Sequence, residues 1–200
     1  MSIEKQLNLK FPIYWNGWPI EKEFAKYLIY TIVTNKPLNI VELGSGTSSL
    51  IILKTLKKLG CKYRLTSVDS DKIFLEKTKN PLLAEDVYDE DNVKLIFAPI
   101  KELILGEEKY KWYDRDKLNF DFDKIDLLFI DGPIGKLCKN SRYPALVIMK
   151  KYLKEGSMAI LHDAKRKDEL EIVDLWKDEN PEIKSISKID TERGGVEIIF

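Results

Sequence analysis

The chain has 200 residues, 44% of them hydrophobic and 33% charged, which suits one globular domain with a sizeable core. Its 33 Lys and Arg residues balance 33 Asp and Glu residues, so charge gives no sign of non-specific binding to nucleic acid or membranes. Two cysteines are too few for a disulfide framework, and no apolar run approaches the roughly 20 residues of a membrane span. The N-terminus shows no signal-peptide pattern, and we expect a cytoplasmic protein.

Residues 1–36 are predicted to form an aromatic strap followed by a helix. The strap mixes aromatic residues with proline and glycine, which argue against regular structure; its aromatics are Phe11, Tyr14, Trp15 and Trp18. Two interpretations remain open: the strap packs on the core, or it is a lid whose aromatics wall a ligand pocket. The helix, at about 20–34, is indicated by apolar residues at helical spacing, namely Phe24, Leu28, Ile29 and Ile32.

The stretch 39–49 is an apolar strand that runs into a glycine turn. Gly44 and Gly46 separate the strand from a helical pattern that starts at Thr47 and ends at Gly60. A strand, a glycine turn and a helix in this order are typical of the nucleoside-binding corner of a doubly wound α/β sheet. The first glycine allows the tight turn, and the second lets a ligand approach the bare backbone.

A second strand, predicted at 63–68, ends in Asp69, about 23 residues beyond Gly46. In such corners an acid at this place accepts hydrogen bonds from the ribose hydroxyls of the ligand. Ligands of open α/β sheets bind outside the carboxyl ends of the strands, so Asp69 is expected beside the glycine turn.

The rest of the chain alternates helices and strands. The expected elements are a helix capped by Ser70-Asp71 and ended by Asn80-Pro81, a solvated acidic loop at 85–91, a strand at 93–98, a short helix around 100–105, an excursion from the sheet at 106–124, a strand at 125–130, a loop at 134–140, a helix at 142–153, a strand at 158–161, a helix at about 167–177, and strands at about 184–189 and 196–200. This alternation predicts one α/β domain over residues 1–200, with its sheet core at 37–200. The sheet is expected to be doubly wound, mostly parallel, seven-stranded and Rossmann-like, with a C-terminal antiparallel hairpin.

The glycine corner fits either a nicotinamide dinucleotide or S-adenosylmethionine. The dinucleotide fingerprint has a third glycine where this chain has Ser49. With Glu42 before the turn, the sequence instead forms a Glu-x-Gly-x-Gly pattern that resembles motif I of class I methyltransferases. In that family the acid lies near the methionine end of S-adenosylmethionine, and the glycines underlie its sugar and methionine. The resemblance implies a cofactor site made of Glu42, Gly44, Ser45, Gly46, Asp69, Ser70 and Asp131.

Later motifs resemble those of one branch of class I methyltransferases, over about residues 38–166. They are Trp112-Tyr-Asp114, Asp131-Gly-Pro133, Gly135, Arg142-Tyr-Pro-Ala-Leu146 and Asp163-Ala-Lys-Arg166. His162 stands where the branch usually has the first of two aspartates. The resemblance implies the class of cofactor but does not indicate the methyl acceptor.

Candidate catalytic residues follow the predicted fourth and fifth strands. His162, the only histidine, is a candidate general base that could deprotonate a hydroxyl or amine acceptor. Asp163 could orient it, or could bind a divalent cation together with Asp131. Such a cation is implied by a resemblance to metal-dependent catechol-type O-methyltransferases, although Ala164 replaces their third ligand, an asparagine; two carboxylates and water could still hold Mg²⁺. Arg142 either binds an anionic acceptor or forms a salt bridge at a helix end.

The sequence therefore predicts an S-adenosylmethionine-dependent methyltransferase that acts on a small-molecule or sugar-like acceptor, with oxygen as the expected acceptor atom. A non-catalytic S-adenosylmethionine-binding protein is an alternative, and a nicotinamide-dependent oxidoreductase is another. The chain has no basic stripe and no Asn/Asp-Pro-Pro-Tyr/Phe motif, so a nucleic-acid substrate is not expected. No membrane partner is expected either, and a homodimer is left open.

Overall fold

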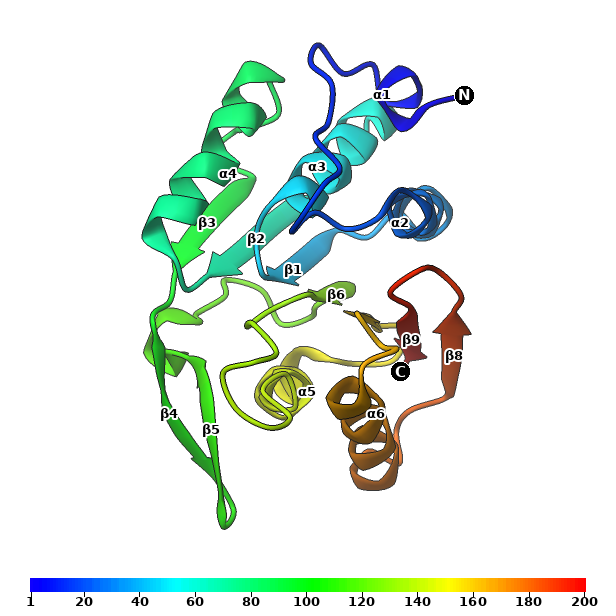
Figure 1. Cartoon of the computed structure of the whole chain (residues 1–200). Coiled ribbons are helices and arrows are strands. Elements are labelled where there is room, and N and C mark those ends of the chain that lie inside the picture. The colour runs from blue at the N-terminus through cyan, green and yellow to red at the C-terminus, as the bar shows by residue number, and fades with distance from the viewer.

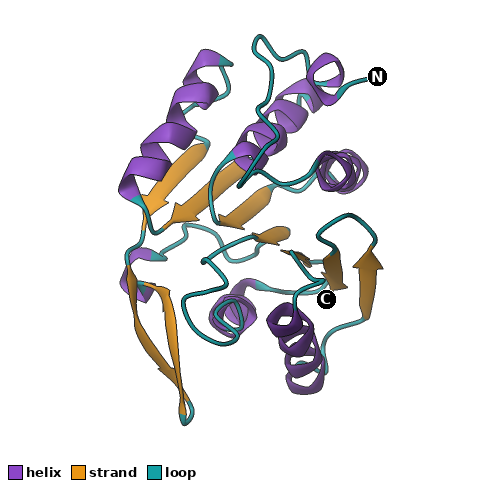
Figure 2. Ribbon diagram, in the orientation of Figure 1, coloured by secondary structure: helices purple, strands orange, loops and turns teal.

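The computed structural model describes residues 1–200 and contains a seven-stranded sheet in the order β3-β2-β1-β6-β7-β9-β8 (Figures 1 and 2). Strands β3, β2, β1, β6 and β7 are parallel, and β9 runs antiparallel to both β7 and β8. The expected doubly wound sheet with a C-terminal antiparallel hairpin is confirmed. Its strands are β1 Asn39–Leu43, β2 Arg64–Asp69, β3 Val93–Phe97, β6 Leu127–Ile130, β7 Met158–His162, β8 Ser185–Ile189 and β9 Gly195–Ile199.

Helices cover both faces of this sheet. Helices α2, α3 and α4 lie over one face, and α5 and α6 lie over the other (Figure 1). Their bounds, with those of the short turns, are α1 Ile3–Gln6, α2 Lys22–Asn35, α3 Thr47–Leu59, α4 Lys72–Ala84, α5 Pro144–Met149 and α6 Lys167–Glu179, and 3-10 turns at Arg115–Lys117 and Lys150–Tyr152. None of the helices combines the length and the apolar character that crossing a bilayer requires.

The two faces of the sheet pack into two apolar cores. Successive side chains of a strand point to opposite faces. In β1, Ile40 therefore packs with residues of α2 and α3, whereas Val41 and Leu43 pack with residues of α5 and α6. All residues of β1, β6 and β7 are buried, which explains why these strands are mostly apolar in the sequence.

Residues 100–105 form a strand, so the short helix expected there is wrong. This strand, β4 (Ile100–Leu105), pairs antiparallel with β5 (Glu108–Tyr113), and the hairpin is separate from the main sheet (Figure 2). Gly106, at φ 60°, opens the turn between the two strands, a position that suits glycine in two-residue hairpins. Only Leu103 of β4 is buried, so its apolar pattern does not distinguish a strand from a helix.

The expected end of a helix at Asn80-Pro81 is also wrong, because α4 continues through Pro81 to Ala84. A proline inside a helix costs one backbone hydrogen bond, and the full burial of Leu82 in the core offsets that loss. The next residue, Glu85, is buried and not solvated. Its carboxylate lies 2.8 Å from Lys54 Nζ.

The N-terminal strap is anchored to the end of α4, but most of its aromatics face solvent. The Glu85 carboxylate accepts hydrogen bonds from the backbone amides of Lys10 and Phe11, at 2.7 and 3.0 Å. The side chains of Phe11, Tyr14 and Trp18 are exposed. The packed-strap interpretation is therefore wrong for these three residues, and the lid stays a prediction.

The turn after β1 lies directly against the turn after β6. Gly44 has a φ of 94°, and a Cβ at this position would come within 2.9 Å of Gly132 N and 3.1 Å of Asp131 C. A Cβ at Gly132 would in turn lie 3.0 Å from the Gly44 backbone. The two glycines let the turns touch, and this close approach sets the spacing of the side chains that follow β1 and β6.

We predict that Gly44→Ala destabilises the protein more than Gly17→Ala does. Gly17 has a similar φ of 91°, but an added Cβ there would meet no atom within 4 Å. The free energy of unfolding of the Gly17→Ala control should therefore fall only by the cost of a left-handed alanine, about 1–2 kcal/mol. For Gly44→Ala it should fall by about 1–3 kcal/mol more, because the added Cβ overpacks the contact. Urea unfolding measures both, and equal losses would contradict the close contact.

Candidate functional site at the carboxyl edge of the sheet

The carboxyl ends of β1, β2, β6 and β7 meet at one edge of the sheet. The structure brings together there the polar residues that the sequence places at strand ends, namely Glu42, Asp69, Asp131, His162 and Asp163. Each parallel strand ends beside its neighbour, so these side chains surround one region where a ligand can bind. Their contacts divide the edge into two parts, one at β1 and β2 and one at β6 and β7.

At the β1 part, Glu42 is fully buried, and only one of its two carboxylate oxygens has hydrogen-bond partners. One carboxylate oxygen, Oε2, accepts hydrogen bonds from the hydroxyls of Ser67, at 2.5 Å, and Ser49. The other, Oε1, has no partner. Burial raises the pKa of Glu42 to about 7, although the serine hydroxyls oppose that shift. The unpaired oxygen is a buried acceptor without a donor, which calls for a partner such as a water molecule or a ligand group.

Ser49, which replaces the third glycine of the dinucleotide fingerprint, has a defined role. Its hydroxyl donates to Glu42 and accepts a hydrogen bond from the backbone amide of Gly46 at 3.1 Å. The side chain therefore connects the glycine turn to the acid on β1.

Asp69, at the end of β2, holds the glycine turn in place. Its Oδ2 accepts hydrogen bonds from the amide and the hydroxyl of Ser45, at 3.0 and 2.9 Å, and its Oδ1 accepts one from the amide of Asp71 at 2.9 Å. Since a carboxylate oxygen can accept two hydrogen bonds, Oδ1 retains capacity for a ligand hydroxyl. Ser70 follows at the same edge and is partly exposed.

At the β7 end, His162 is fully buried between two carboxylates. Nδ1 lies 2.9 Å from Asp131 Oδ1, and Nε2 lies 2.8 Å from Glu21 Oε2. The Phe24 ring packs on the imidazole, with 4.3 Å between centroids. Burial lowers the pKa of His162, but Asp131 and Glu21 outweigh it and raise that pKa to about 9. The ring is therefore a protonated imidazolium at neutral pH, with both nitrogens engaged.

Glu21 is a site residue that the sequence does not reveal. It precedes α2, 141 residues from His162, and its carboxylate also accepts hydrogen bonds from the Thr191 hydroxyl at 2.7 Å and from Arg193 Nε at 3.0 Å. An acid at the start of a helix has a local explanation as a favourable charge at the helix N-terminus. No local pattern indicates its pairing with a distant histidine.

Arg142 forms the salt bridge at a helix start that was one of its two expected roles. Its side chain is buried and donates to the backbone oxygens of Pro133, at 3.2 Å, and His162, at 3.0 Å. Its Nη2 lies 3.4 Å from Asp131 Oδ1 and 3.2 Å from Asp163 Oδ2. With its donors used inside the protein, the guanidinium is not presented to an anionic acceptor.

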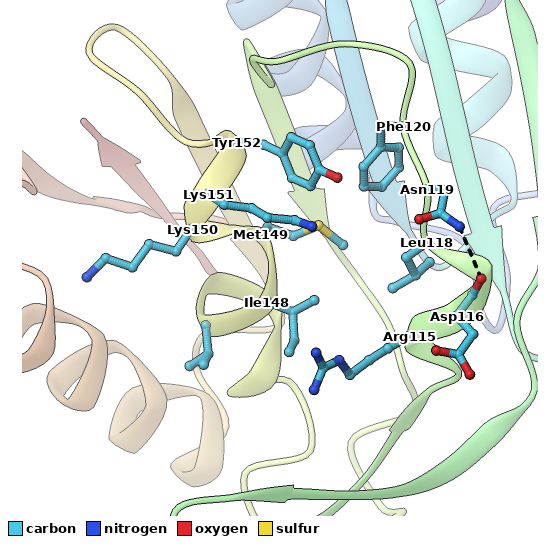
Figure 3. A pocket seen from close by; sticks show the side chains of 11 residues that line it. Arg115, Asp116, Leu118, Asn119, Phe120, Ile148, Met149, Lys150, Lys151 and Tyr152 are labelled. Carbon is cyan, nitrogen blue, oxygen red and sulfur yellow. Dashed lines mark hydrogen bonds between the residues drawn. The ribbon is translucent and has the colours of Figure 1, made fainter.

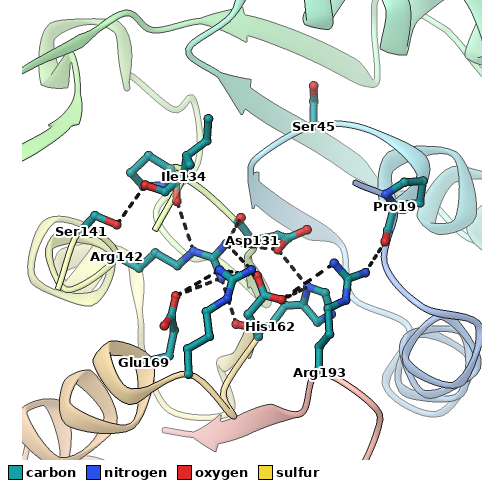
Figure 4. Close-up of polar contacts among 12 residues, drawn as sticks. Pro19, Ser45, Asp131, Ile134, Ser141, Arg142, His162, Glu169 and Arg193 are labelled. Carbon is teal, nitrogen blue, oxygen red and sulfur yellow. Dashed lines mark hydrogen bonds and ion pairs between the residues drawn. The ribbon is translucent and has the colours of Figure 1, made fainter. Parts of the chain in front are cut away.

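These residues belong to a central charge cluster at β6 and β7 (Figure 4). Its members are the acids Glu21, Asp131, Asp163 and Glu169 and the cations Arg142, Arg166, Arg193 and His162. Counted as ionised, the four acids balance the four cations only if His162 carries a proton. Asp131 is the most accessible of the acids, with 21% of its side chain exposed against 8% or less for the others.

The cluster does not fit a divalent cation. Ligand atoms of Asp131, His162 and Asp163 do lie within 4.8 Å of one another. However, the space between the two carboxylates is bridged by the Arg142 guanidinium, and both imidazole nitrogens are paired with carboxylates. A fixed cation of the protein therefore occupies the position that Mg²⁺ would need.

A separate cavity of about 730 Å³ lies between the segment after β5 and the end of α5 (Figure 3). Its walls combine cations with apolar and aromatic side chains, including Arg115, Phe120, Ile148, Lys151 and Tyr152. None of the strand-end residues contributes to it, so it is distinct from the candidate site.

Comparisons with known proteins bear on the family and the fold. Residues 41–164 match the family model described as Methyltransferase domain. The structure resembles SAH-bound PaMTH1, a methyltransferase of Podospora anserina, with a TM-score of 0.68, 15% identity, and coverage of 99% of this chain and 86% of that one. It also resembles an O-methyltransferase from Bacillus cereus in complex with SAH (TM-score 0.67, 12% identity, 93% and 84% coverage). A third similar structure is the O-methyltransferase TomG of Streptomyces achromogenes in complex with SAM (TM-score 0.66, 12% identity, 98% and 85% coverage). No match to a curated protein was found.

We predict that the wild-type protein has no stoichiometric Mn²⁺ site, because Arg142 bridges Asp131 and Asp163. Electron paramagnetic resonance during Mn²⁺ titration should show only weak surface binding. Arg142→Met should gain binding, since it removes the guanidinium that bridges the two carboxylates and leaves Asp131 with His162 and Asp163 with Arg166. The control Lys139→Met removes a surface cation that pairs with Glu171 and should change nothing. A single wild-type Mn²⁺ site that Asp163→Asn abolishes would contradict this arrangement.

Proposed function

The chain belongs to the methyltransferase-domain family, whose model matches residues 41–164, and we propose on this basis that it is an S-adenosylmethionine-dependent enzyme. Its acceptor is proposed to be a small molecule methylated at oxygen. Two of the similar structures are O-methyltransferases by name, in complex with SAH or SAM. The observation that carries the proposal for this chain is the buried, half-satisfied carboxylate of Glu42 beside a glycine turn.

The β1 and β2 part of the edge is the proposed cofactor site. The unpaired Oε1 of Glu42 is suited to the ammonium of the methionine portion, directly or through a water. Gly44, Ser45 and Gly46 offer bare backbone beneath the ligand, and Asp69 Oδ1 has capacity for a ribose hydroxyl. When bound, S-adenosylmethionine supplies the electrophilic sulfonium methyl group. The protein positions it and excludes water.

Asp131 is the proposed contact to the acceptor. It follows β6, and it is the cluster acid with the largest exposed fraction. Burial opposes its ionisation, but His162 and Arg142 hold the pKa of Asp131 below its usual value. An ionised carboxylate could accept the hydrogen bond of an acceptor hydroxyl, orient its oxygen for in-line attack on the methyl group, and take up the hydroxyl proton that methylation releases.

His162, Asp163 and Arg142 are proposed to position Asp131. A general-base role for His162 requires that it release one of its two carboxylate contacts, at 2.9 and 2.8 Å, and lose its proton. The geometry favours a fixed cation that orients Asp131. His162 therefore acts on the reaction through Asp131, and Arg142 contacts the same carboxylate oxygen, Oδ1.

We predict that S-adenosylmethionine and S-adenosylhomocysteine bind to the wild type in isothermal titration calorimetry. Asp69→Asn should weaken binding by about tenfold or more, because a charged acceptor of the ribose hydroxyl is lost. The matched control Asp121→Asn removes an exposed acid paired with Lys94 and should leave affinity unchanged. Binding of NAD in place of both ligands would refute the proposed function.

A further inference from the structure

Tyr113 is a buried phenol that reaches the proposed cofactor site from outside the main sheet. It is the last residue of β5, at the base of the β4–β5 hairpin (Figure 1), and only 2% of it is exposed. Its hydroxyl lies so close to the turn after β6 that a Cβ at Gly132 would come within 2.2 Å of it. The glycine of the Asp131-Gly-Pro motif therefore makes room for this hydroxyl.

Three acids of the strand ends and Arg142 are near enough to affect the pKa of Tyr113, but its hydroxyl donates to none of the acids. Burial and the charges of Asp69, Asp131 and Glu42 raise the pKa of Tyr113 well above its ordinary value. The group is consequently a neutral hydrogen-bond donor at any physiological pH. A buried tyrosine hydroxyl normally has a partner. Tyr113 makes no hydrogen bond to a protein group.

The position of this hydroxyl can be stated from its neighbours. Gly132 packs on Gly44, so the hydroxyl lies where the turns after β1 and β6 touch. The ring is fixed there by Trp112, whose ring lies edge-on at 5.5 Å, and by the antiparallel pairing of Tyr113 with Ile100. The hydroxyl is therefore held at the contact between the two turns, at the edge of the proposed site.

The amides of the glycine turn cannot provide that donor. Gly44 N donates to Val68 O at 2.8 Å, and Ser45 N donates to Asp69 Oδ2 at 3.0 Å. Gly46 N donates to the Ser49 hydroxyl at 3.1 Å. The nearby cation Arg142 is bound to acids of the charge cluster. These three amides and this guanidinium are therefore already paired within the protein, whereas the Tyr113 hydroxyl is not.

We propose that the Tyr113 hydroxyl donates a hydrogen bond to the α-carboxylate of the bound cofactor. This inference rests on the proposed S-adenosylmethionine site. Glu42 Oε1 is the free acceptor that suits the ammonium, and the ammonium and the carboxylate are attached to the same carbon atom. An unpaired donor beside Gly132 and an unpaired acceptor on β1 match the carboxylate and the ammonium of the cofactor's amino-acid portion. The β4–β5 hairpin thereby becomes part of cofactor recognition.

Calorimetry with two ligands tests the proposal. S-adenosylhomocysteine carries the amino-acid portion, and 5′-methylthioadenosine has the same nucleoside without it. Tyr113→Phe should weaken S-adenosylhomocysteine binding by about tenfold, the usual effect of losing a hydrogen bond to a charged group. The affinity of the Tyr113→Phe variant for 5′-methylthioadenosine should equal that of the wild type. Tyr110→Phe, on the same hairpin and stacked on Tyr143 at 5.3 Å, is the control and should bind both ligands normally.

The remaining outcomes each decide a separate question. If the wild type binds S-adenosylhomocysteine and Tyr113→Phe binds it equally well, the proposal is overturned while the proposed function stands. An equal loss of affinity for both ligands also overturns it, because the hydroxyl would then contact the nucleoside. Failure of the wild type to bind either ligand overturns the proposed function, and this proposal with it. Thermal unfolding of the variant should match the wild type, since the substitution removes only an unpaired hydroxyl.

Discussion

The candidate site depends on one buried arrangement, in which the His162 ring lies between the carboxylates of Asp131 and Glu21. Charged groups are costly to bury unless they are paired and hydrogen-bonded. A protonated ring satisfies both carboxylates and balances the charge of the cluster, whereas a neutral ring would leave one excess negative charge. The same contact joins the start of α2 to the ends of β6 and β7. It therefore both fixes the edge of the sheet and orients Asp131.

The two parts of the edge use different electrostatics. At β1 and β2, Glu42 and Asp69 are held by hydroxyls and amides without a counter-charge, and burial raises the pKa of Glu42 to about 7. At β6 and β7 the acids are ion-paired, and the pKa of Asp131 is lowered despite its burial. The first part leaves an acceptor unpaired for a ligand, and the second keeps a carboxylate ionised. Arg142 supplies the bridging cation that a metal would otherwise provide.

The sequence predicts the sheet and the strand-end acids because both have local signals. Buried strands such as β6 are continuous apolar runs, and Asp69 ends β2 while Asp131 directly follows β6. The β4–β5 hairpin is missed because its strands are largely exposed and carry little periodicity. Glu21 is missed for another reason, because its contact with His162 joins segments far apart in the chain and nothing near it indicates that partner. Tyr113 lies in the Trp112-Tyr-Asp114 motif, but that motif does not indicate the approach of its hydroxyl to Gly132.

Nitrogen-15 NMR of the imidazole side chain tests this account most directly, because His162 is the only histidine in the chain and its signals need no assignment. We expect both ring nitrogens to be protonated at pH 7.5, with a single titration near pH 9, in line with the pKa that the two carboxylates raise to about 9. A neutral ring at pH 7.5 that titrates near or below its ordinary pKa, about 6.5, would contradict the buried imidazolium. His162 would then be free to act as a general base, and the Asp131 carboxylate would have to be oriented by a group other than an imidazolium.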